Sequence, residues 1–232
     1  MEALVLVPGL LCTEALYAPQ IAALADRPIM VADHRRHETM REIAEDILKG
    51  APRRFALAGL SMGGYVALEI MRIAPERVTR LALLDTTARP DTPEQTQNRN
   101  KQIELTRNGA FDRVAQALFP MFVHENREDD GALRDIVLGM AKKTGGEAFI
   151  RQQHAIMSRD DARPRLSQIQ CPTMVIVGDG DRLTPPDRAE ELHRAIPGSR
   201  LEVVANCGHL STLERPEAVT SLFMDWLSGA AA

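Results

Sequence analysis

The sequence has few cysteines, few aromatic residues and no long hydrophobic run. Only 3 of its 232 residues are cysteine, and they stand far apart without a CxxC pair. This spacing excludes a disulfide scaffold and favours reduced thiols in a cytoplasmic protein. The formal net charge is -4, with Lys+Arg 28 against Asp+Glu 32, so no basic surplus points to nucleic acid as a partner.

Membrane association is not expected either. No uninterrupted apolar stretch approaches the roughly 20 residues of a membrane span. The first residues, Met1–Gly9, carry an acid at the second position and a Pro-Gly pair after five apolar residues, which is unlike a secretory signal. Hydrophobic residues make up 44% and charged residues 26%, as is usual for a globular protein. We therefore expect one domain, or one domain with an inserted lobe.

Short apolar runs rich in β-branched residues alternate with amphipathic segments along most of the chain. Such runs are typical of strands buried on both faces, and strands that alternate with helices indicate a parallel sheet. The predicted strands are Leu4–Val7, Pro28–Ala32, Arg54–Gly59, Arg80–Leu84, Thr173–Gly178 and Arg200–Val204, and the predicted helices include Met62–Ile73, Pro186–Ile196 and Glu217–Leu227.

This alternation breaks once, after the fourth predicted strand. From about Thr86 to Leu166 no strand pattern appears, and apolar residues recur at helical spacing. A long helical stretch followed by a return to strand and helix predicts an insertion into one fold. We expect residues 1–85 and 167–232 to form the core domain and residues 86–166 to form a helical cap.

A G-x-S-x-G motif, residues 59–63, lies where a predicted strand ends and a predicted helix begins. In that context the motif places its serine on a tight turn that exposes the hydroxyl group above the sheet. The flanking positions need to lack side chains because neighbouring backbone passes close by, and Gly59 and Gly63 meet this need. Ser61 is therefore the candidate nucleophile.

A serine hydroxyl group needs a base that takes its proton and an acid that holds the base. Asp179 and Asp181 follow the fifth predicted strand, and His209 follows the sixth. The carboxyl ends of parallel strands meet at one edge of a sheet, where open α/β sheets bind their ligands. We expect Ser61, an aspartate and His209 to meet there.

In these motifs the sequence resembles the α/β-hydrolase family, and the resemblance covers nearly the whole chain. The serine turn, the segment Gly178–Pro185 and the segment Gly208–Pro216 match the family pattern. The resemblance implies an α/β fold with a mostly parallel sheet of about six strands, helices on both faces and an inserted helical cap. It does not imply a cofactor or a metal ion.

The resemblance also implies a role for each site residue by its position. Ser61 is the nucleophile, His209 the base and Asp181 the orienting acid. Asp179 is the neighbouring alternative for the acid, and Asp85 occupies the family's rarer position for it.

An oxyanion hole of two backbone N–H groups is a further implication of the resemblance. Its donors correspond to Met62 and Leu10, with Leu11 as the alternative to Leu10. Where the family commonly has His-Gly, this chain has Pro8-Gly9, but the donors are backbone groups and the hole is expected to survive. Such donors are typically worth about 3–4 kcal/mol in the transition state.

Weaker signals point to substrate contacts. His34 and Arg35 follow the second predicted strand and are candidates for binding a substrate carboxylate, although a solvated loop that leads into the next helix is the favoured explanation. Within the predicted cap, aromatic residues at helical spacing are either pocket walls or ordinary packing. The candidates there are Phe119, Phe122 and His154.

Together these patterns predict a cofactor-free serine hydrolase, monomer or homodimer, that cleaves a small or medium carboxylic ester, thioester or lactone through an acyl-enzyme. Its partner is a small-molecule substrate.

A serine nucleophile argues against the family's dehalogenases and epoxide hydrolases, which use aspartate. Hydrolysis of a C–C bond, opening of an enol-lactone in aromatic catabolism and perhydrolysis are alternatives within the enzyme class. A non-catalytic small-ligand receptor on the same scaffold is the alternative from another class.

Overall fold

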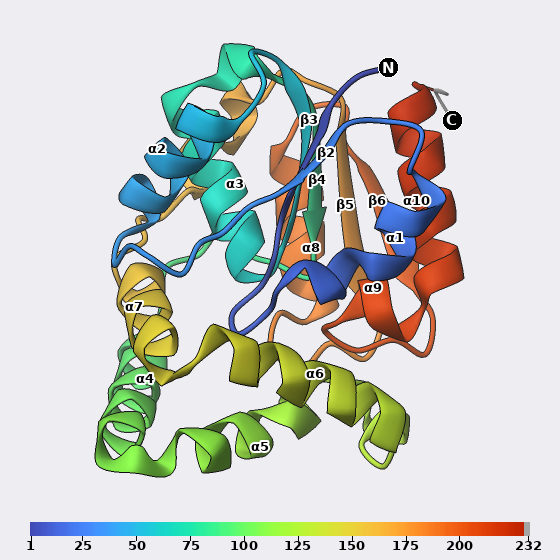
Figure 1. The fold of residues 1–232 in the computed structure, drawn as a ribbon. Helices are drawn as coiled ribbons and strands as arrows, with labels where there is room; N and C mark the ends of the chain where they lie inside the picture. Colours follow the sequence, from blue (N-terminus) through green and yellow to red (C-terminus); the bar gives the residue numbers. More distant parts are fainter. Residues whose placement is uncertain (230–232) are drawn as a thin grey trace.

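A computed structural model describes residues 1–229 and contains one six-stranded sheet between two layers of helices (Figure 1). All neighbouring strands are parallel, in the order β2-β1-β3-β4-β5-β6. This confirms the predicted fold class, and each strand lies within about two residues of its predicted position. The strands are β1 (Leu4–Val7), β2 (Ile29–Val31), β3 (Phe55–Leu60), β4 (Val78–Leu84), β5 (Thr173–Gly178) and β6 (Arg200–Val204).

Burial of the strands follows from their place in the sheet. Every residue of the inner strands β1, β3 and β5 is buried, which explains why they read as continuous apolar runs. The edge strand β2 is only half-buried at all three residues, and at the other edge β6 is half-buried or exposed at its first four residues and buried only at Val204. The inner strands are therefore packed on both faces and support the loops that follow them.

Helices cover both faces of the sheet. On one face, α2 (Met40–Gly50), α3 (Met62–Ile73) and α8 (Pro186–Ala195) share an apolar core with the sheet. On the other face lie α1 (Ala18–Ala23) and α10 (Pro216–Ser228), with the short α9 (Ser211–Glu214) beside them. Helix α1 was not predicted, because its six residues show no helical periodicity. Within residues 1–229 no helix is long and apolar enough to cross a bilayer.

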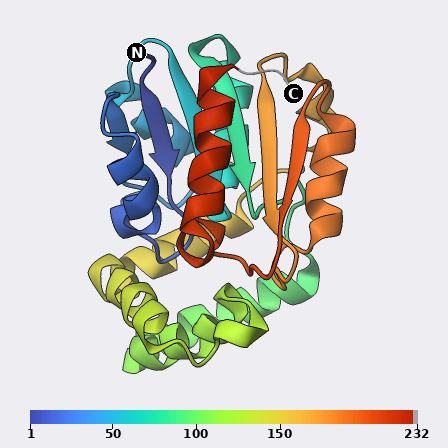
Figure 2. The same ribbon diagram turned by 90° about the vertical axis from the view of Figure 1, so that its right-hand side faces the viewer.

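Four helices between β4 and β5 form an insertion, α4 (Pro93–Leu105), α5 (Phe111–Phe122), α6 (Gly131–Thr144) and α7 (Gly146–Met157). They lie across the carboxyl ends of the strands (Figure 2). The described chain has no strand between Leu84 and Thr173. Thr92 starts α4 with a reciprocal cap to Gln95, and Asp130 caps α6, so the helix boundaries are set by local side-chain bonds.

The strand order places a crevice at the carboxyl ends of β1 and β3. From β1 the chain moves to β2 on one side, and it then returns past β1 to β3 on the other side. Loops that leave neighbouring strands in opposite directions open a gap, where α/β sheets bind ligands. The loops that border this gap carry Leu10 and Ser61.

Candidate active site

Ser61 lies on the turn between β3 and α3 in a backbone conformation that side chains rarely adopt. Its φ of 56° and ψ of -116° are stabilised by a hydrogen bond from its N–H to the Leu84 carbonyl oxygen, at 2.9 Å. A Cβ atom at Gly59 would lie 2.2 Å from the Gly63 oxygen, and one at Gly63 would lie 1.9 Å from the Val7 oxygen. The two glycines are therefore required by close backbone approach, as the motif predicted.

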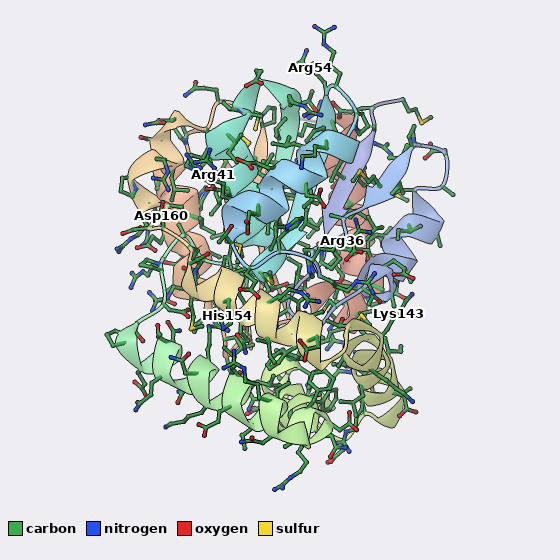
Figure 3. The ribbon with its side chains drawn as sticks, turned by 60° about the vertical axis from the view of Figure 1, so that its left-hand side comes forward. Arg36, Arg41, Arg54, Lys143, His154 and Asp160 are labelled. Atoms are coloured by element: carbon green, nitrogen blue, oxygen red, sulfur yellow. The ribbon has the colours of Figure 1, made fainter. Side chains whose placement is uncertain are left out.

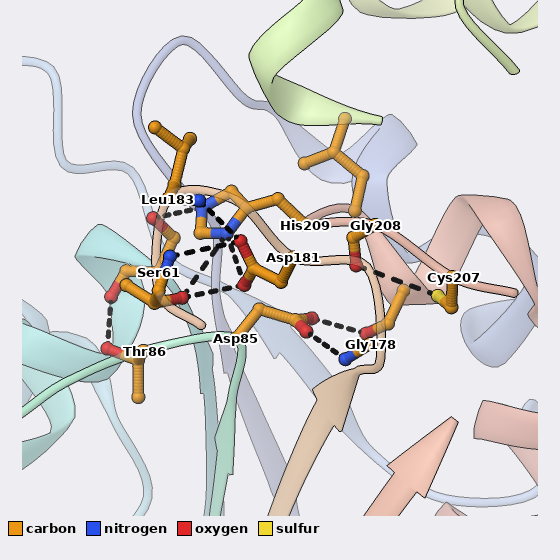
Figure 4. A network of polar contacts seen from close by, with 12 residues as sticks. Ser61, Asp85, Thr86, Gly178, Asp181, Leu183, Cys207, Gly208 and His209 are labelled. Carbon is orange, nitrogen blue, oxygen red and sulfur yellow. Dashed lines mark hydrogen bonds and ion pairs between the residues drawn. The ribbon is translucent and has the colours of Figure 1, made fainter. Parts of the chain in front are cut away.

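Three side chains form a continuous hydrogen-bonded chain above the sheet (Figure 4). The Ser61 hydroxyl group is 2.8 Å from Nε2 of His209, and Nδ1 of His209 is 2.8 Å from Oδ2 of Asp181. The side chains of His209 and Asp181 are 3% and 0% exposed. With Nδ1 donating to the carboxylate, Nε2 is free to accept the serine proton.

Asp181 is fixed by four hydrogen bonds on its two oxygen atoms. Oδ1 accepts from the N–H groups of Leu183 at 2.8 Å and Thr184 at 3.0 Å, and Oδ2 accepts from the Thr184 hydroxyl group at 2.7 Å as well as from His209. Burial opposes ionisation of Asp181, but the charge of His209 and these bonds outweigh it and hold its pKa below the usual value. Conversely, burial disfavours protonated His209, but the charge and hydrogen bond of Asp181 outweigh it and raise its pKa.

The two alternative acids have other partners. Asp85 is fully buried, and its oxygens accept from the Gly178 N–H at 2.9 Å and from the Ser211 hydroxyl group. Burial and the nearby charge of Asp181 raise the pKa of Asp85 to about 8. Asp179 accepts from the Cys207 N–H at 3.0 Å. Among the described residues, only Asp181 is a carboxylate in hydrogen-bond contact with His209.

The turn after β1 and the start of α3 present two N–H groups near Ser61. Leu11 has a φ of 61° and donates its N–H to Oε1 of Gln152 at 3.2 Å, so this group is already used. Within residues 1–229 the N–H groups of Leu10 and Met62 have no hydrogen-bond partner. Of the two leucines, Leu10 is thus the one with a free donor, and it borders the cavity described next.

A cavity of about 390 Å³ opens above Ser61 and His209. Its floor comes from the sheet loops and its far walls from α4, α5 and α7 of the insertion. Phe122 lines it, with its ring centroid 6.3 Å from that of His209 at an interplanar angle of 23°. Further wall residues are Tyr65, Thr87, Arg89, Arg99, Gln102, Leu118, Met121, Arg159 and Arg188. Within residues 1–229, no three His, Cys, Asp or Glu side chains are grouped so that they could hold a metal ion.

The model of the alpha/beta hydrolase family matches residues 4–222 of this chain. The protein belongs to the α/β-hydrolase family. A pimeloyl-[acyl-carrier protein] methyl ester esterase of Neisseria meningitidis serogroup C is 30% identical over 179 residues, covering 75% of this chain and 69% of the relative. This α/β hydrolase is therefore an enzyme of the hydrolase class.

Two solved structures have the same fold over almost the whole chain. A malate-bound thermophilic esterase from Thermogutta terrifontis has a TM-score of 0.89 and 29% identity, covering 98% of this chain and 90% of that one. An enol-lactonase from Burkholderia xenovorans has a TM-score of 0.88 and 27% identity, covering 98% and 91%.

Four of the five expected substrate contacts of this α/β hydrolase lie outside the cavity, which corrects that expectation. His34 is 2% exposed, and its Nε2 is 3.0 Å from the Pro8 oxygen while Nδ1 is 2.8 Å from Nε2 of Gln152. Arg35 is turned onto Asp33, with contacts at 2.8 and 3.0 Å. Both side chains are engaged by neighbouring groups of the protein, and neither lines the cavity above Ser61.

The other two corrections lie in the insertion. Phe119 is 1% exposed and packs beneath the Arg134 guanidinium group, at 5.0 Å from its ring centroid. His154, shown on α7 in Figure 3, is 3.4 Å from the Glu38 carboxylate and does not line the cavity. Phe119 and Phe122 lie one helical turn apart on α5, but only Phe122 lines the cavity. The packing of the insertion decides which of the two does so.

Several residues of the cavity wall were not predicted from the sequence, and they differ in whether a local sequence signal marks them. Tyr65 stands one helical turn after Ser61, so its position beside Ser61 follows from helix geometry. Arg99 and Arg159 come from α4 and from the segment after α7, and nothing in their local sequence sets them apart from the other arginines. Their place in the site depends on tertiary packing alone.

Proposed function

We propose that this α/β hydrolase cleaves a carboxylic ester, thioester or lactone by nucleophilic catalysis through an acyl-enzyme. The observation that carries the proposal is the chain of contacts from Ser61 through His209 to Asp181, which ends at an open cavity. A serine within hydrogen-bond reach of a base, with the base oriented by a third group, is the arrangement that activates a serine hydroxyl group.

In the first half of the reaction, Ser61 Oγ attacks the carbonyl carbon and its proton passes to Nε2 of His209. The carbonyl oxygen becomes an oxyanion, which accepts hydrogen bonds from the N–H groups of Leu10 and Met62. His209 then gives its proton to the leaving oxygen or sulfur, and the bond to the leaving group breaks. This step leaves the acyl group on Ser61.

In the second half, a water molecule attacks the acyl carbon while His209 takes one of its protons. The same two N–H groups hold the second oxyanion. The bond from the acyl carbon to Ser61 Oγ breaks, and His209 returns the proton to Ser61. Throughout, Asp181 keeps Nδ1 of His209 protonated and stabilises the positive charge that the ring carries between the two transfers.

The names of the relatives support ester and lactone substrates. The curated relative is a methyl ester esterase, and the two solved structures are an esterase and an enol-lactonase. A lactone is an internal ester, so its opening needs the same groups, and the leaving oxygen stays attached to the acyl group. C–C bond hydrolysis and a non-catalytic receptor function gain no support from these names.

Labelling with a fluorophosphonate tests the nucleophile. We expect one label per chain, mapped by peptide mass spectrometry to Ser61, and no label on Ser61→Ala. Ser221→Ala is a matched control, because Ser221 is exposed on α10 away from the site. Labelling of Ser61→Ala at the wild-type rate, or no labelling of the wild type, would refute the assignment and leave a receptor as the better explanation.

A substrate panel tests the reaction. We expect hydrolysis of p-nitrophenyl esters and of simple lactones by the wild type, with a burst of p-nitrophenol that equals the enzyme concentration if deacylation is slower than acylation. Ser61→Ala should lose this activity. Cleavage confined to C–C bonds, with esters and lactones untouched, would replace the proposed function by that alternative.

A further inference from the structure

The wall of the catalytic cavity is rich in positive charge. Arg89, Arg99, Arg159 and Arg188 line it, and among the described residues no aspartate or glutamate does. The carboxylates that pair with these arginines do not line the cavity. Arg188 pairs with Asp187 at 3.2 Å, and Arg89 pairs with Glu191 at 2.9 Å. Glu191 also lies 4.0 Å from Arg163, which has its own carboxylate in Asp161 at 2.6 Å, so these charges balance.

The other two arginines share a single carboxylate. Asp91 accepts from Nε of Arg99 at 2.6 Å and lies 2.8 Å from Nη2 of Arg159. Its side chain is 3% exposed, and those of Arg159 and Arg99 are 7% and 19% exposed. Two guanidinium groups against one carboxylate leave one positive charge without a counter-charge, at a largely buried position.

Both guanidinium groups keep donors for a ligand. A guanidinium group has five N–H donors. Arg99 directs three at Asp91 and Gln153, and Arg159 directs three at Asp91 and the carbonyl oxygens of Arg89 and Ile156. Two N–H groups on each side chain therefore have no partner among the described residues.

The position of this pair relative to the nucleophile follows from α3. Tyr65 lies one helical turn from Ser61, and the Arg159 guanidinium group lies over the Tyr65 ring at 4.3 Å from its centroid. A ligand that reacts at Ser61 and extends along α3 thus reaches Arg159 and Arg99. The polar side chains of Thr87 and Gln102 also line the cavity.

We propose that Arg99 and Arg159 form a subsite for a carboxylate group of the substrate, so that the preferred substrate is an ester, thioester or lactone that carries a second, ionised carboxyl group. The proposal rests on the proposed hydrolytic function. A carboxylate carries one negative charge, which equals the surplus charge of the Arg99–Asp91–Arg159 cluster, and its two oxygens match the planar guanidinium donors. A phosphate dianion would leave one negative charge without a partner.

Desolvation gives the subsite its selectivity. In the empty cavity, water can hydrate the surplus charge. A neutral substrate chain that displaces this water would leave a buried cation without a partner, which is costly. An ionised carboxyl group replaces the water and neutralises the charge, so discrimination comes from disfavouring neutral chains as well as from binding the anion.

Matched ester pairs test this preference on the wild-type enzyme. On the acyl side, the mono-p-nitrophenyl esters of succinic, adipic and suberic acid are compared with the same compounds methylated at the free carboxyl group. On the alcohol side, the butanoate ester of p-hydroxybenzoate is compared with that of methyl p-hydroxybenzoate. We expect at least a tenfold higher kcat/KM for the anionic member in one of the two arms, about 1.4 kcal/mol.

Variants assign the preference to the cluster. Arg99→Gln should reduce the ratio of anionic to neutral kcat/KM at least tenfold, since it removes the surplus charge. Arg113→Gln is the matched control, because Arg113 is exposed on α5 of the insertion and does not line the cavity. A merely structural role of Arg99 would lower both members of a pair together and leave the ratio unchanged. Even if Arg99→Gln does not fold, equal wild-type rates for the anionic and neutral members of every pair would overturn the proposal.

The outcomes separate the two proposals. Equal rates for anionic and neutral members in both arms, with Ser61 labelled and esters cleaved, overturn the carboxylate subsite and leave the hydrolytic function intact. No cleavage of any ester together with no labelling of Ser61 overturns the hydrolytic function and the subsite with it. Stronger competitive inhibition by phenyl phosphate than by benzoate contradicts the choice of a carboxylate.

Discussion

Glu214 joins the histidine loop to the end of α5 through the backbone of His124. Oε2 of Glu214 accepts from the His124 N–H at 2.8 Å, while Oε1 accepts from the N–H groups of Gly208 at 3.0 Å and Leu210 at 3.3 Å. Glu214 is only 1% exposed. One buried carboxylate thus holds both neighbours of His209 and the segment that follows Phe122.

We expect Glu214→Gln to lower both stability and kcat. The amide retains one acceptor and turns a donor towards an N–H group, and an unpaired buried N–H group costs about 1–3 kcal/mol. The loop that carries His209 should loosen, so kcat falls more than KM changes. Thermal unfolding and steady-state kinetics measure the two effects, with a Tm shift of about 2–4 °C for each kcal/mol lost. Glu217→Gln, exposed on α10, is the control; an unchanged Tm in Glu214→Gln would contradict the prediction.

We expect Asp181→Asn to reduce kcat on the order of 10⁴-fold. It should also shift the pH profile. The base must be unprotonated to accept the Ser61 proton, so kcat/KM of the wild type should rise with pH through a His209 pKa that lies above the usual histidine value. Without Asp181 the charge that favours protonated His209 is lost and burial remains, so the acid limb of the residual activity should move to lower pH.

Asp179→Asn is the matched control for this change, because Asp179 bonds the Cys207 N–H through an oxygen that asparagine retains. Its profile of kcat/KM against pH should overlay that of the wild type. An acid limb that stays in place in Asp181→Asn would mean that Asp181 does not set the pKa of His209.

Asp85 should make the folded state less stable as pH rises. Its pKa is about 8 in the folded protein, against 3.8 for a free side chain, so between these values the unfolded chain releases a proton that the folded chain keeps. The free energy of unfolding therefore falls as pH rises through this window. Asp85→Asn removes the effect, and its stability relative to the wild type should increase from about pH 5 to about pH 8 in urea unfolding.

Asp85→Asn also tests whether Asp85 takes part in the reaction. Asp85 bonds Gly178 and Ser211 rather than His209, so its loss should reduce kcat far less than the loss of Asp181. A larger loss in Asp85→Asn than in Asp181→Asn would make Asp85 the acid that orients His209.

Gln152 on α7 connects the insertion to the turn that presents Leu10. It donates to Nδ1 of His34 at 2.8 Å and accepts from the Leu11 N–H at 3.2 Å. Gln152→Leu leaves both groups unpaired, so we expect a loss of about 1–3 kcal/mol for each and a lower kcat with a smaller change in KM. Urea unfolding and kinetics measure this, with Gln116→Leu, exposed on α5, as the control. Equal effects of the two variants on stability and kcat would mean that Gln152 does not support the turn.

The sheet could be predicted from sequence because its signals are local. Apolar runs, glycine and proline stops and the order of strand and helix gave all six strands, and G-x-S-x-G before a helix gave the strained position of Ser61. His209 and Asp181 followed from a rule about where parallel strands end. Helix α1 was missed because six residues are too few for a period to show.

The wall of the cavity above Ser61 could not be predicted in this way. His34 and Arg35 had the chemistry of a carboxylate grip but face other protein groups, whereas Arg99 and Arg159 are brought together by Asp91 from distant parts of the chain. Periodicity places a residue on a helix face, but it does not say what that face meets.

The sequence by itself determined the sheet, the turn that carries Ser61 and the order of Ser61, Asp181 and His209 along the chain, because backbone sterics and strand direction act over a few residues at a time. Only the tertiary structure decided which of three aspartates meets His209, which leucine keeps a free N–H group and which arginines line the cavity. Those outcomes depend on side-chain directions and on the packing of α4–α7 across the strand ends, where groups far apart in sequence compete for the same partners.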